Sequence, residues 1–378
     1  MRYLRAAKRG EMEEKMKKYA YYLPQFHRIP ENDKWWGDGF TEWTNVKKAK
    51  KLYANHKQPK VPLNNNYYSL DNIETMKWQA ELLKEYKLDG LIFYHYYFIG
   101  KKLLEKPAEL LLNHKDVDLD FFFCWANHSW YRSWEGSKEL LMEQTYGSIL
   151  EWEDHFQYLL PFFKDRRYVK KDNKPLFMIF KSDFKEKNEI LNYFDKRCKE
   201  NGFAGICIIE TMTSYNTNKN FADNDLKVES HYIHFREPDA SRYCYIKSIS
   251  HILIRIYNKL RKSMVNLGLL YVEKYDGNLL YNIMINTKVP SKYYIRGLFF
   301  EWDNTPRHSY RGYIITPPDK ELFFSYMNSI KADEFLFINA WNEWCEGMML
   351  EPTVENKYKY LEWIKEWSEE NENRINGI

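Results

Sequence analysis

The sequence has few cysteines and few glycines for its length. Its five cysteines, in 378 residues, are widely spaced and form no CxxC pair, so they predict neither a disulfide framework nor a zinc site. None of the 15 glycines builds a phosphate-binding loop after a candidate strand, which argues against a nucleotide-binding Rossmann fold. An HExxH metal motif is also absent. We therefore expect no metal, no cofactor and a reducing, cytoplasmic location.

Long apolar runs and a strong charge of one sign are missing as well. No segment has the length of a membrane span or the pattern of a secretory signal. Residues 1–18 contain seven basic and three acidic residues, and we interpret them as a polar N-terminal leader. The net charge of +4 is too mild to predict a nucleic-acid partner.

Aromatic residues are unusually abundant, at 18% of the chain, with 13 Trp, 31 Tyr and 23 Phe. Most Phe residues are expected in the core. Many Trp and Tyr residues instead stand next to polar residues in short motifs. This is the composition of sites that stack the apolar faces of sugars and bind their hydroxyls by hydrogen bonds.

Eight short apolar segments alternate with amphipathic helical patterns. The pattern predicts an α/β fold, namely a (β/α)8 TIM barrel with long loops and a helical insertion between strands 6 and 7. We expect residues 19–378 to form this single domain, with the insertion at about 238–292. The expected strands are residues 19–23, 91–96, 120–125, 175–180, 204–210, 228–234, 295–300 and 334–340. The main expected helices are residues 70–86, 102–113, 151–163, 186–201, 321–331 and 358–370.

The insertion contains a basic amphipathic helix, predicted at residues 242–262. Its apolar stripe consists of Ile246, Ile249, Leu253, Ile256, Tyr257 and Leu260. Its polar face has no acid and consists of Arg242, Lys247, Arg255, Lys259, Arg261 and Lys262. We favour a helix that packs its stripe on the barrel, because long insertions are ordinary in barrels. The alternative is a weak association with lipid-linked glycan or an anionic membrane surface.

The last strand leads directly into two acids. Residues 335–338 form a continuous apolar run, the pattern of a strand buried on both faces. Glu343 and Glu346 follow it, at the end of the strand where barrel enzymes place their chemistry. Positions three apart on one strand face opposite sides. The two acids can therefore share a site only if the chain bends or starts a helical turn after Asn342.

Two tryptophans, Trp341 and Trp344, flank these acids. Solvated acids at a strand end would be the commoner arrangement for Glu. Indole rings, however, would desolvate at least one carboxyl and raise its pKa. One protonated acid beside one ionised acid is the pair that glycoside hydrolysis needs. The sequence therefore predicts that Glu343 and Glu346 are catalytic.

Four further clusters place Trp or Tyr beside polar side chains where candidate strands end. Taken alone, His95 fits a core histidine, Arg132 a surface salt bridge and Trp302 simple packing. Together with the last strand, the clusters predict a cleft for a sugar chain. The predicted substrate-binding residues are Gln25, His27, Trp36, Glu42, Trp43, Tyr94, His95, Tyr96, Trp125, Asn127, Trp130, Arg132, Trp302, Asp303, Asn342 and Trp344.

These motifs resemble the WbsX-like family of bacterial polysaccharide gene clusters, which is similar to family 99 of the glycoside hydrolases, the endo-α-mannosidases and endo-mannanases. The resemblance runs from about Tyr21 to Glu351. The matching pieces are YLPQFH (22–27), WWGDGFTEW (35–43), YHYYF (94–98), WDNTPR (302–307) and WNEWCEG (341–347). Two positions depart from the family pattern. His128 stands where the family usually has a glutamate, and Cys345 replaces a common glycine.

The resemblance implies a mechanism for the two acids. Glu343 would be the base that removes the proton of the sugar's 2-hydroxyl, whose oxygen closes onto C1 as a 1,2-anhydro sugar. Glu346 would be the acid that protonates the leaving oxygen. Water would then open the three-membered ring, with overall retention of configuration. The implied activity is a retaining, endo-acting glycoside hydrolase for a mannose-like bacterial polysaccharide or oligosaccharide.

Two alternatives to hydrolysis stay open. The first is a glycosyltransferase or transglycosidase of O-antigen or capsule assembly, in which a sugar hydroxyl replaces water. The metal-holding DxD motif of many nucleotide-sugar transferases does occur, at residues 116–118 and 118–120. It precedes the third strand, however, and so lies at the wrong end of the barrel. The second alternative is a glycan-binding protein without catalysis.

Overall fold

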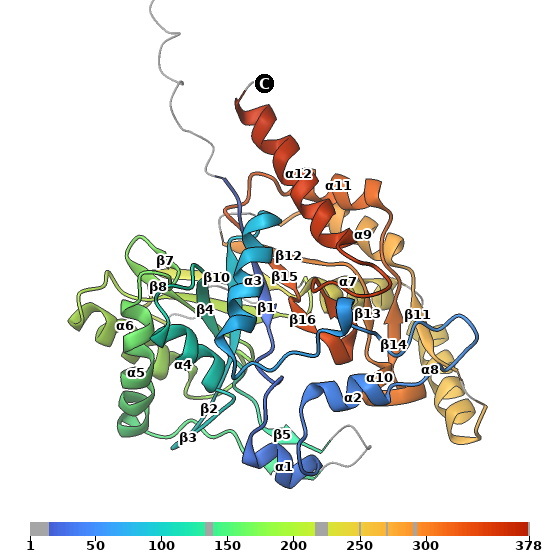
Figure 1. Ribbon diagram of the computed structural model, residues 1–378, viewed down its shortest axis with the longest axis horizontal. Coiled ribbons are helices and arrows are strands. Elements are labelled where there is room, and N and C mark those ends of the chain that lie inside the picture. The colour runs from blue at the N-terminus through green and yellow to red at the C-terminus, as the bar shows by residue number, and fades with distance from the viewer. Residues whose placement is uncertain are drawn as a thin grey trace, which may run out of the picture.

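The computed structural model describes residues 15–132, 139–215, 226–248, 251–269, 271–289 and 293–376. Eight parallel strands form a closed barrel, since β1 pairs with both β2 and β15 (Figure 1). Around the barrel, the strands are β1 (Lys17–Tyr22), β2 (Gly90–Phe98), β4 (Asp120–Trp125), β8 (Lys174–Ile179), β9 (Cys207–Met212), β10 (Ser230–Phe235), β12 (Tyr294–Phe299) and β15 (Phe335–Asn339). The predicted (β/α)8 barrel is confirmed, and each predicted strand overlaps one of these.

The barrel interior is filled largely by aromatic rings. The ring of Tyr19 lies 5.4 Å from that of Phe122, which lies 5.5 Å from that of Phe337. The next layer brings the Tyr21 ring within 5.5 Å of Tyr94 and 5.8 Å of His234. Because side chains alternate along a strand, residues two apart point to the same face. The interior is therefore a packed core, as in other barrels of this kind.

Helices cover the outside of the barrel. They are α3 (Ile73–Glu85), α4 (Lys106–Asn113), α5 (Ile149–Lys164), α6 (Lys187–Glu200), α7 (Glu237–Ser248), α9 (Gly277–Asn286), α11 (Lys320–Ser329) and α12 (Lys359–Asn376). The helix predicted from residue 102 was wrong in its first turn. Residues 101–103 form β3 (Lys101–Leu103), antiparallel to the end of β2. The helix starts only near Pro107, which occupies its first turn.

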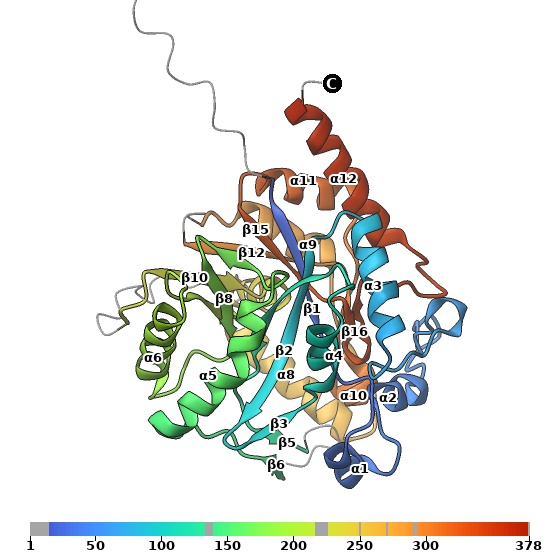
Figure 2. The same ribbon diagram turned by 60° about the vertical axis from the view of Figure 1, so that its left-hand side comes forward.

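Shorter elements occupy the connections. The long loop after β1 contains α1 (Pro30–Trp36), α2 (Glu42–Lys48) and η1 (Leu63–Asn65). The others are β5 (Trp130–Tyr131), β6 (Leu140–Met142), β7 (Lys170–Lys171), β11 (Glu273–Tyr275), β13 (Trp302–Asp303), α10 (Thr305–His308), η2 (Ser309–Arg311) and β14 (Tyr313–Ile315). In Figures 1 and 2, α1, α2, α10, β3 and β5 lie at the end of the barrel opposite to the start of β1. The carboxyl ends of the strands point to this end.

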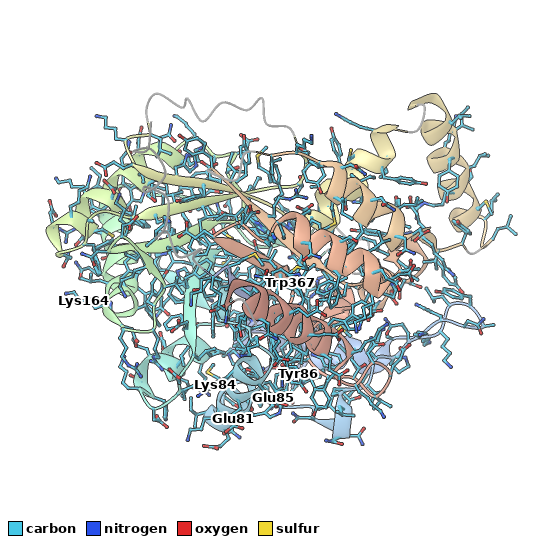
Figure 3. All side chains as sticks on the ribbon, turned by 90° about the horizontal axis from the view of Figure 1, so that it is seen from above. Glu81, Lys84, Glu85, Tyr86, Lys164 and Trp367 are labelled. Carbon is cyan, nitrogen blue, oxygen red and sulfur yellow. The ribbon has the colours of Figure 1, made fainter. Side chains whose placement is uncertain are left out.

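Helix α12 runs toward the other end of the barrel. Figure 3 shows α12, with Trp367, next to α3, whose last turn carries Glu81, Lys84 and Glu85. Tyr86, which follows α3, stacks on Tyr358 at 5.7 Å between ring centroids. Trp367 is buried and donates its indole N–H to Asn328. These contacts are far from the carboxyl ends of the strands.

The predicted leader and insertion differ in detail from expectation. β1 starts at Lys17, inside the predicted leader, and residues 1–14 of that leader lie outside the described residues. The described residues of the predicted basic helix belong to α7 and to α8 (His251–Asn266). Ile246 of α7 packs against the core, and Ile249 lies outside the described residues.

The apolar stripe of α8 does not pack on the barrel. Leu253, Ile256, Tyr257 and Leu260 are all exposed, so the packing interpretation was wrong for this half of the stripe.

All five cysteines are free thiols, and all except Cys244 are buried. Among the residues described, no helix combines the length and the apolar character needed to cross a bilayer.

Candidate active site

After β15 the chain makes the bend that the two acids require. β16 (Asn342–Glu343) pairs with β17 (Met348–Met349), and the 3-10 turn η3 (Trp344–Glu346) lies between them. Gly347 closes the turn with φ +64°, a conformation that residues with a Cβ rarely adopt. A Cβ at this position would lie 2.8 Å from the backbone nitrogen of Asp303 in β13. The turn therefore needs glycine for both its conformation and its close approach to β13.

One guanidinium contacts both predicted catalytic acids. Arg307 of α10 lies with Nη1 2.6 Å from Glu346 Oε1 and with Nη2 3.6 Å from Glu343 Oε2. The same Nη2 lies 3.2 Å from Oε1 of Glu42, whose side chain is completely buried. The structure thus brings Glu343 and Glu346 into one site, as predicted. It also shows that Arg307 and Glu42 belong to the same cluster.

The two acids differ in burial and in charge. Burial, followed by the negative charge of Glu346, raises the pKa of Glu343 to about 8. Burial also raises the pKa of Glu346, while the positive charges of Arg307 and Arg236 oppose this rise. The Glu346 side chain is 22% exposed and that of Glu343 9% exposed. Glu346 has the closer contact with Arg307, which favours its ionised form, whereas burial and the charge of Glu346 favour the protonated form of Glu343.

Burial thus raises the pKa of both carboxyls, in the direction that the sequence analysis expected for at least one of them. The acid that this arrangement favours in the protonated form, Glu343, is the one that the resemblance implies as the base. A base must, however, be ionised to accept a proton. The implied roles therefore require that a proton moves from Glu343 to Glu346 when substrate binds.

Two tyrosines of β2 lie within electrostatic reach of the acids. Burial raises the pKa of both Tyr94 and Tyr96, and the charge of Glu343 adds to the rise in each case. The Tyr96 ring also lies 5.0 Å from the ring of Trp130. Tyr94 and Tyr96 are two residues apart on one strand and therefore share a face. These predicted residues and the acids come together as expected.

Three predicted residues form a separate aromatic group beside Tyr96. Arg132 lies 5.1 Å above the ring of Trp36 and donates to the carbonyl oxygen of Trp35 at 2.6 Å. The ring of Trp35 is in turn 5.7 Å from that of Trp130. Arg132 also pairs with Glu139 at 2.8 Å. Partly exposed aromatic faces next to a cation are suited to contact with sugars, so Trp36, Trp130 and Arg132 remain candidates for substrate binding.

His95 and Trp125 lie on the outer face of the barrel. His95 Nε2 lies 2.9 Å from Nε2 of His155 in α5, and the Trp125 ring lies 5.0 Å from the His155 ring. Burial lowers the pKa of His95 to about 3. His95 lies between Tyr94 and Tyr96 on the strand, so it points away from the acids. The core-histidine alternative for His95 is the one that the structure supports.

Three predicted polar residues make bonds that hold the framework. The amide of Asn342 accepts from the N–H of Leu23 at 2.7 Å and donates to its carbonyl at 3.0 Å. The amide of Asn127 bridges the backbone of Lys181 in the same two-bond manner, at 2.8 and 2.7 Å. Asp303 accepts from Gln58 at 2.9 Å and from the Thr305 N–H at 3.0 Å. Their bonding groups are thus engaged within the protein.

The remaining predicted residues are buried in the protein. The rings of Trp43 and Trp344 are 5.2 Å apart, and the Trp302 ring stacks on Tyr313 at 5.3 Å. Gln25 and His27 are also buried. Motifs rich in Trp and Asn therefore contain two kinds of residue, those that face the site and those that build its wall, and spacing alone does not separate them.

Sequence reasoning missed Arg307, Arg236 and Glu351 as site residues. Arg307 belongs to the WDNTPR motif, and Arg236 directly follows β10, at the same end of the barrel as the acids. Glu351 accepts hydrogen bonds from Trp344 at 2.7 Å, Tyr68 at 2.8 Å and Gln79 at 2.7 Å. Burial raises the pKa of Glu351 to about 7. Arg236 could have been predicted as a site residue from its position directly after a barrel strand.

A cavity of about 580 Å³ lies beyond Asp303 and is not lined by the acids. Its lining includes His56 and Gln58, which contact Asp303, together with Lys60 and Thr353. In the described part of the chain, no group of three or more His, Cys, Asp or Glu side chains is arranged to hold a metal ion.

Comparisons with known proteins agree with this architecture. In sequence, the chain is 29% identical over 357 residues to the uncharacterized protein WxcX of two strains of Xanthomonas campestris pv. campestris, B100 and ATCC 33913. The match covers 91% of this chain and 48% of each relative. The chain thus spans about half the length of these curated relatives.

Solved structures share the fold at low sequence identity. The family 99 endo-α-mannosidase of Bacteroides thetaiotaomicron superposes with a TM-score of 0.54 at 12% identity, covering 96% of this chain and 98% of that one. A glycoside hydrolase-like protein gives 0.57 at 12% identity, covering 95% of each chain. These two likenesses establish the fold. The sequence pattern of the family described as Glycosyltransferase WbsX matches residues 18–364, and the chain therefore belongs to that family.

Proposed function

We propose that the protein is a glycan-processing enzyme, and specifically a retaining, endo-acting glycoside hydrolase for a mannose-like polysaccharide or oligosaccharide. The observation that carries the proposal is the pair Glu343 and Glu346, held by the single guanidinium of Arg307. One protonated and one ionised carboxyl is the state that acid–base cleavage of a glycosidic bond requires. The fold shared with an endo-α-mannosidase supports the proposal.

In the proposed reaction, Glu343 removes the proton of the sugar's 2-hydroxyl. The freed oxygen attacks C1 and forms a 1,2-anhydro sugar, while the bond from C1 to the leaving oxygen breaks. Glu346 gives its proton to that oxygen. Water then adds at C1, gives one proton back to Glu346 and opens the ring, and O2 recovers its proton from Glu343. The protein supplies no nucleophile, which suits two acids on one short turn.

Arg307 provides a physical route for the proton shift that these roles need. Its guanidinium contacts both carboxyls, at 2.6 Å for Glu346 and 3.6 Å for Glu343. A cation favours the ionised form of the carboxyl that it approaches. A sugar that separates Arg307 from Glu346 would raise the pKa of Glu346 and leave the cation to Glu343. The proton would then pass from Glu343 to Glu346, as the proposed roles require.

A transferase is the second candidate function, because the chain belongs to a family whose description names a glycosyltransferase. The same intermediate would be opened by a sugar hydroxyl in place of water. The two reactions differ only in the acceptor. Mass spectrometry of products formed in ¹⁸O-labelled water, with and without added oligosaccharide acceptor, separates them. Label in the new reducing end indicates hydrolysis, and lengthened, unlabelled product indicates transfer.

The activity test compares wild type with Glu346→Gln and Glu343→Gln on manno-oligosaccharides and on the polysaccharide of the source organism. The readout is the release of reducing ends. We expect each substitution to reduce turnover by about 100-fold or more, the range for loss of a general acid or base. Glu210→Gln is a matched control, since Glu210 is buried but pairs with Lys187, away from Arg307.

Normal turnover in Glu346→Gln would reject the proposed role of that acid. If the wild type and the double variant Glu343→Gln/Glu346→Gln both bind glycan and neither turns it over, the result would instead support a glycan-binding protein. The cytoplasmic location stays a prediction from the cysteine pattern.

A further inference from the structure

Helix α8 exposes an apolar stripe that no described element covers. The large side chains Leu253, Ile256 and Leu260 are 61%, 51% and 58% exposed, and Leu267, just after the helix, is 75% exposed. Tyr257 and Met264 of the same helix are also exposed. These residues follow one another at spacings of three and four, so they lie on one face of the helix. A contiguous exposed apolar face of this kind marks an interaction surface.

The charge around this stripe has one sign. From residue 240 to residue 272 the sequence contains no Asp or Glu and contains six Lys or Arg residues. Lys247 and Lys259 are exposed. Arg261 pairs with Glu273 at 3.1 Å, and Arg242 lies 4.3 Å above the ring of Tyr313. The side chains of Arg255 and Lys262, which also belong to the predicted polar face, lie outside the described residues.

The contacts of Arg261 and Arg242 connect α8 and α7 to the candidate active site. Glu273 belongs to β11, which pairs with β14, and β14 pairs with β13. A Cβ on Gly347, directly after η3, would touch Asp303 of β13. In Figures 1 and 2, α8 lies at the end of the molecule that carries α2 and α10. The exposed stripe and the acid pair are therefore at the same end of the barrel.

We propose that α8 docks on an anionic membrane surface. Its apolar stripe would enter the boundary between headgroups and acyl chains, and the exposed Lys259, together with Lys247 of α7, would contact anionic headgroups. The argument for this occupant is charge complementarity. A second copy of this chain would place one acid-free basic helix against another, and like charges oppose that contact. Because α8 lies at the same end of the barrel as the acid pair, docking would bring the candidate active site near the membrane. A glycan carried on a lipid would then be close to it, a step that rests on the proposed function.

The test is co-sedimentation of the full chain with vesicles. We expect binding to vesicles of phosphatidylglycerol and phosphatidylcholine, and at least 10-fold weaker binding to phosphatidylcholine alone. High salt should weaken the binding, because screening acts on the headgroup contacts. The triple variant Leu253→Gln/Ile256→Gln/Leu260→Gln should lose at least 10-fold in partitioning. Lys247→Glu/Lys259→Glu should lose binding to anionic vesicles.

A matched control removes exposed apolar side chains elsewhere. Ile149 and Leu150 of α5 are 59% and 76% exposed, and Ile149→Gln/Leu150→Gln should bind vesicles like the wild type. Hydrogen exchange of the wild type, which depends on no variant, should slow within residues 251–269 when anionic vesicles are added.

Three results would overturn the proposal. They are equal binding of the triple variant and the wild type, no binding of the wild type to anionic vesicles, and a wild-type dimer that the triple variant abolishes in the absence of lipid.

Discussion

Three carboxyls and two arginines meet where the last strand ends, and their charges do not balance. Glu42, Glu343 and Glu346 surround Arg307, and Arg236 adds a second, more distant positive charge. Burial of an ionised carboxyl is costly unless a cation or hydrogen bonds compensate it. Burial and the neighbouring acids therefore favour a proton on Glu343, whose pKa they raise to about 8. Such an arrangement costs stability, which is common where a site is built for function.

This cost predicts how Glu343→Gln changes stability with pH. The pKa of Glu343 in the folded protein, about 8, lies above the ordinary value of 4.5 for a glutamate side chain. The unfolded chain therefore releases this proton at lower pH than the folded chain does. As a result, the wild type loses stability as pH rises through that window, by about 1.4 kcal/mol per unit at most. Glu343→Gln cannot ionise, so it should be more stable than the wild type at pH 8 and nearly equal at pH 4.

Differential scanning calorimetry at the two pH values measures this effect. The expected sign is a higher Tm for Glu343→Gln at pH 8. An identical change in Tm at pH 4 and pH 8 would show that Glu343 does not retain its proton in the folded protein.

Arg307 gives the complementary prediction. Arg307→Met removes the cation that contacts Glu42, Glu343 and Glu346, and breaking a buried ion pair typically costs about 3–5 kcal/mol. The free energy of unfolding should therefore fall sharply at pH 8. The loss should shrink at pH 5, because protonated carboxyls need no cation. Turnover should fall as well. Arg307→Lys keeps the charge but cannot contact both carboxyls through two nitrogens, so its stability and turnover should lie between those of the wild type and Arg307→Met.

Urea unfolding at both pH values measures the change in stability. A loss that is the same at pH 5 and pH 8 would mean that the arginine contributes packing alone.

The turn η3, which Gly347 closes, positions Glu346 in the candidate active site. Gly347→Ala adds a Cβ 2.8 Å from the Asp303 nitrogen and places Ala at φ +64°. The turn η3 should move away from β13 and carry Glu346 with it, so turnover should fall about 10-fold or more, since small displacements of a catalytic group are costly. Gly100→Ala is the matched control, because Gly100 has φ +69° and nothing within 4 Å of its added Cβ.

Both alanine variants should lose about 1 kcal/mol from backbone strain. Only Gly347→Ala should lose activity. Equal activity in the two variants would show that the contact between the turn and β13 does not position Glu346.

The barrel strands were predictable because their residues are apolar on both faces and alternate with helices. The starts of helices were harder to predict. Residues 102–103 fit the helical pattern that follows them, but they form part of β3, which pairs with the end of β2. The surroundings of the basic segment could not be predicted from its apolar spacing. Ile246 packs on the core, whereas Leu253 is exposed to solvent.

The acid pair was predictable for a different reason. Acids after a buried strand, among tryptophans, are unusual, so Glu343 and Glu346 stood out in the sequence. Arg307 and Arg236 did not, since an arginine after a strand is common on protein surfaces. His95 and Trp125 were predicted as substrate-binding residues but point to the outer face of the barrel. Which residues of a strand point outward depends on its register, and motif spacing does not fix the register.

The barrel as a whole brings together residues far apart in the chain. Glu42 follows β1, Arg236 follows β10, Arg307 follows β12 and Glu346 follows β15. Closure of the sheet by β1 and β15 places the first and last of these elements side by side. The curated relatives are about twice as long, so their complete activity is a separate question from the barrel's own chemistry.

The central claim is that Glu343 and Glu346 act as base and acid on a bound glycan. It is tested most directly by the turnover of two substrates, the glycan that the wild type cleaves and its aryl glycoside with a good leaving group. A good leaving group needs no acid, so Glu346→Gln should cleave the aryl glycoside at nearly the wild-type rate and the glycan at least about 100-fold more slowly. Glu343→Gln should be slow on both. Wild-type rates on the glycan in either variant would contradict the account.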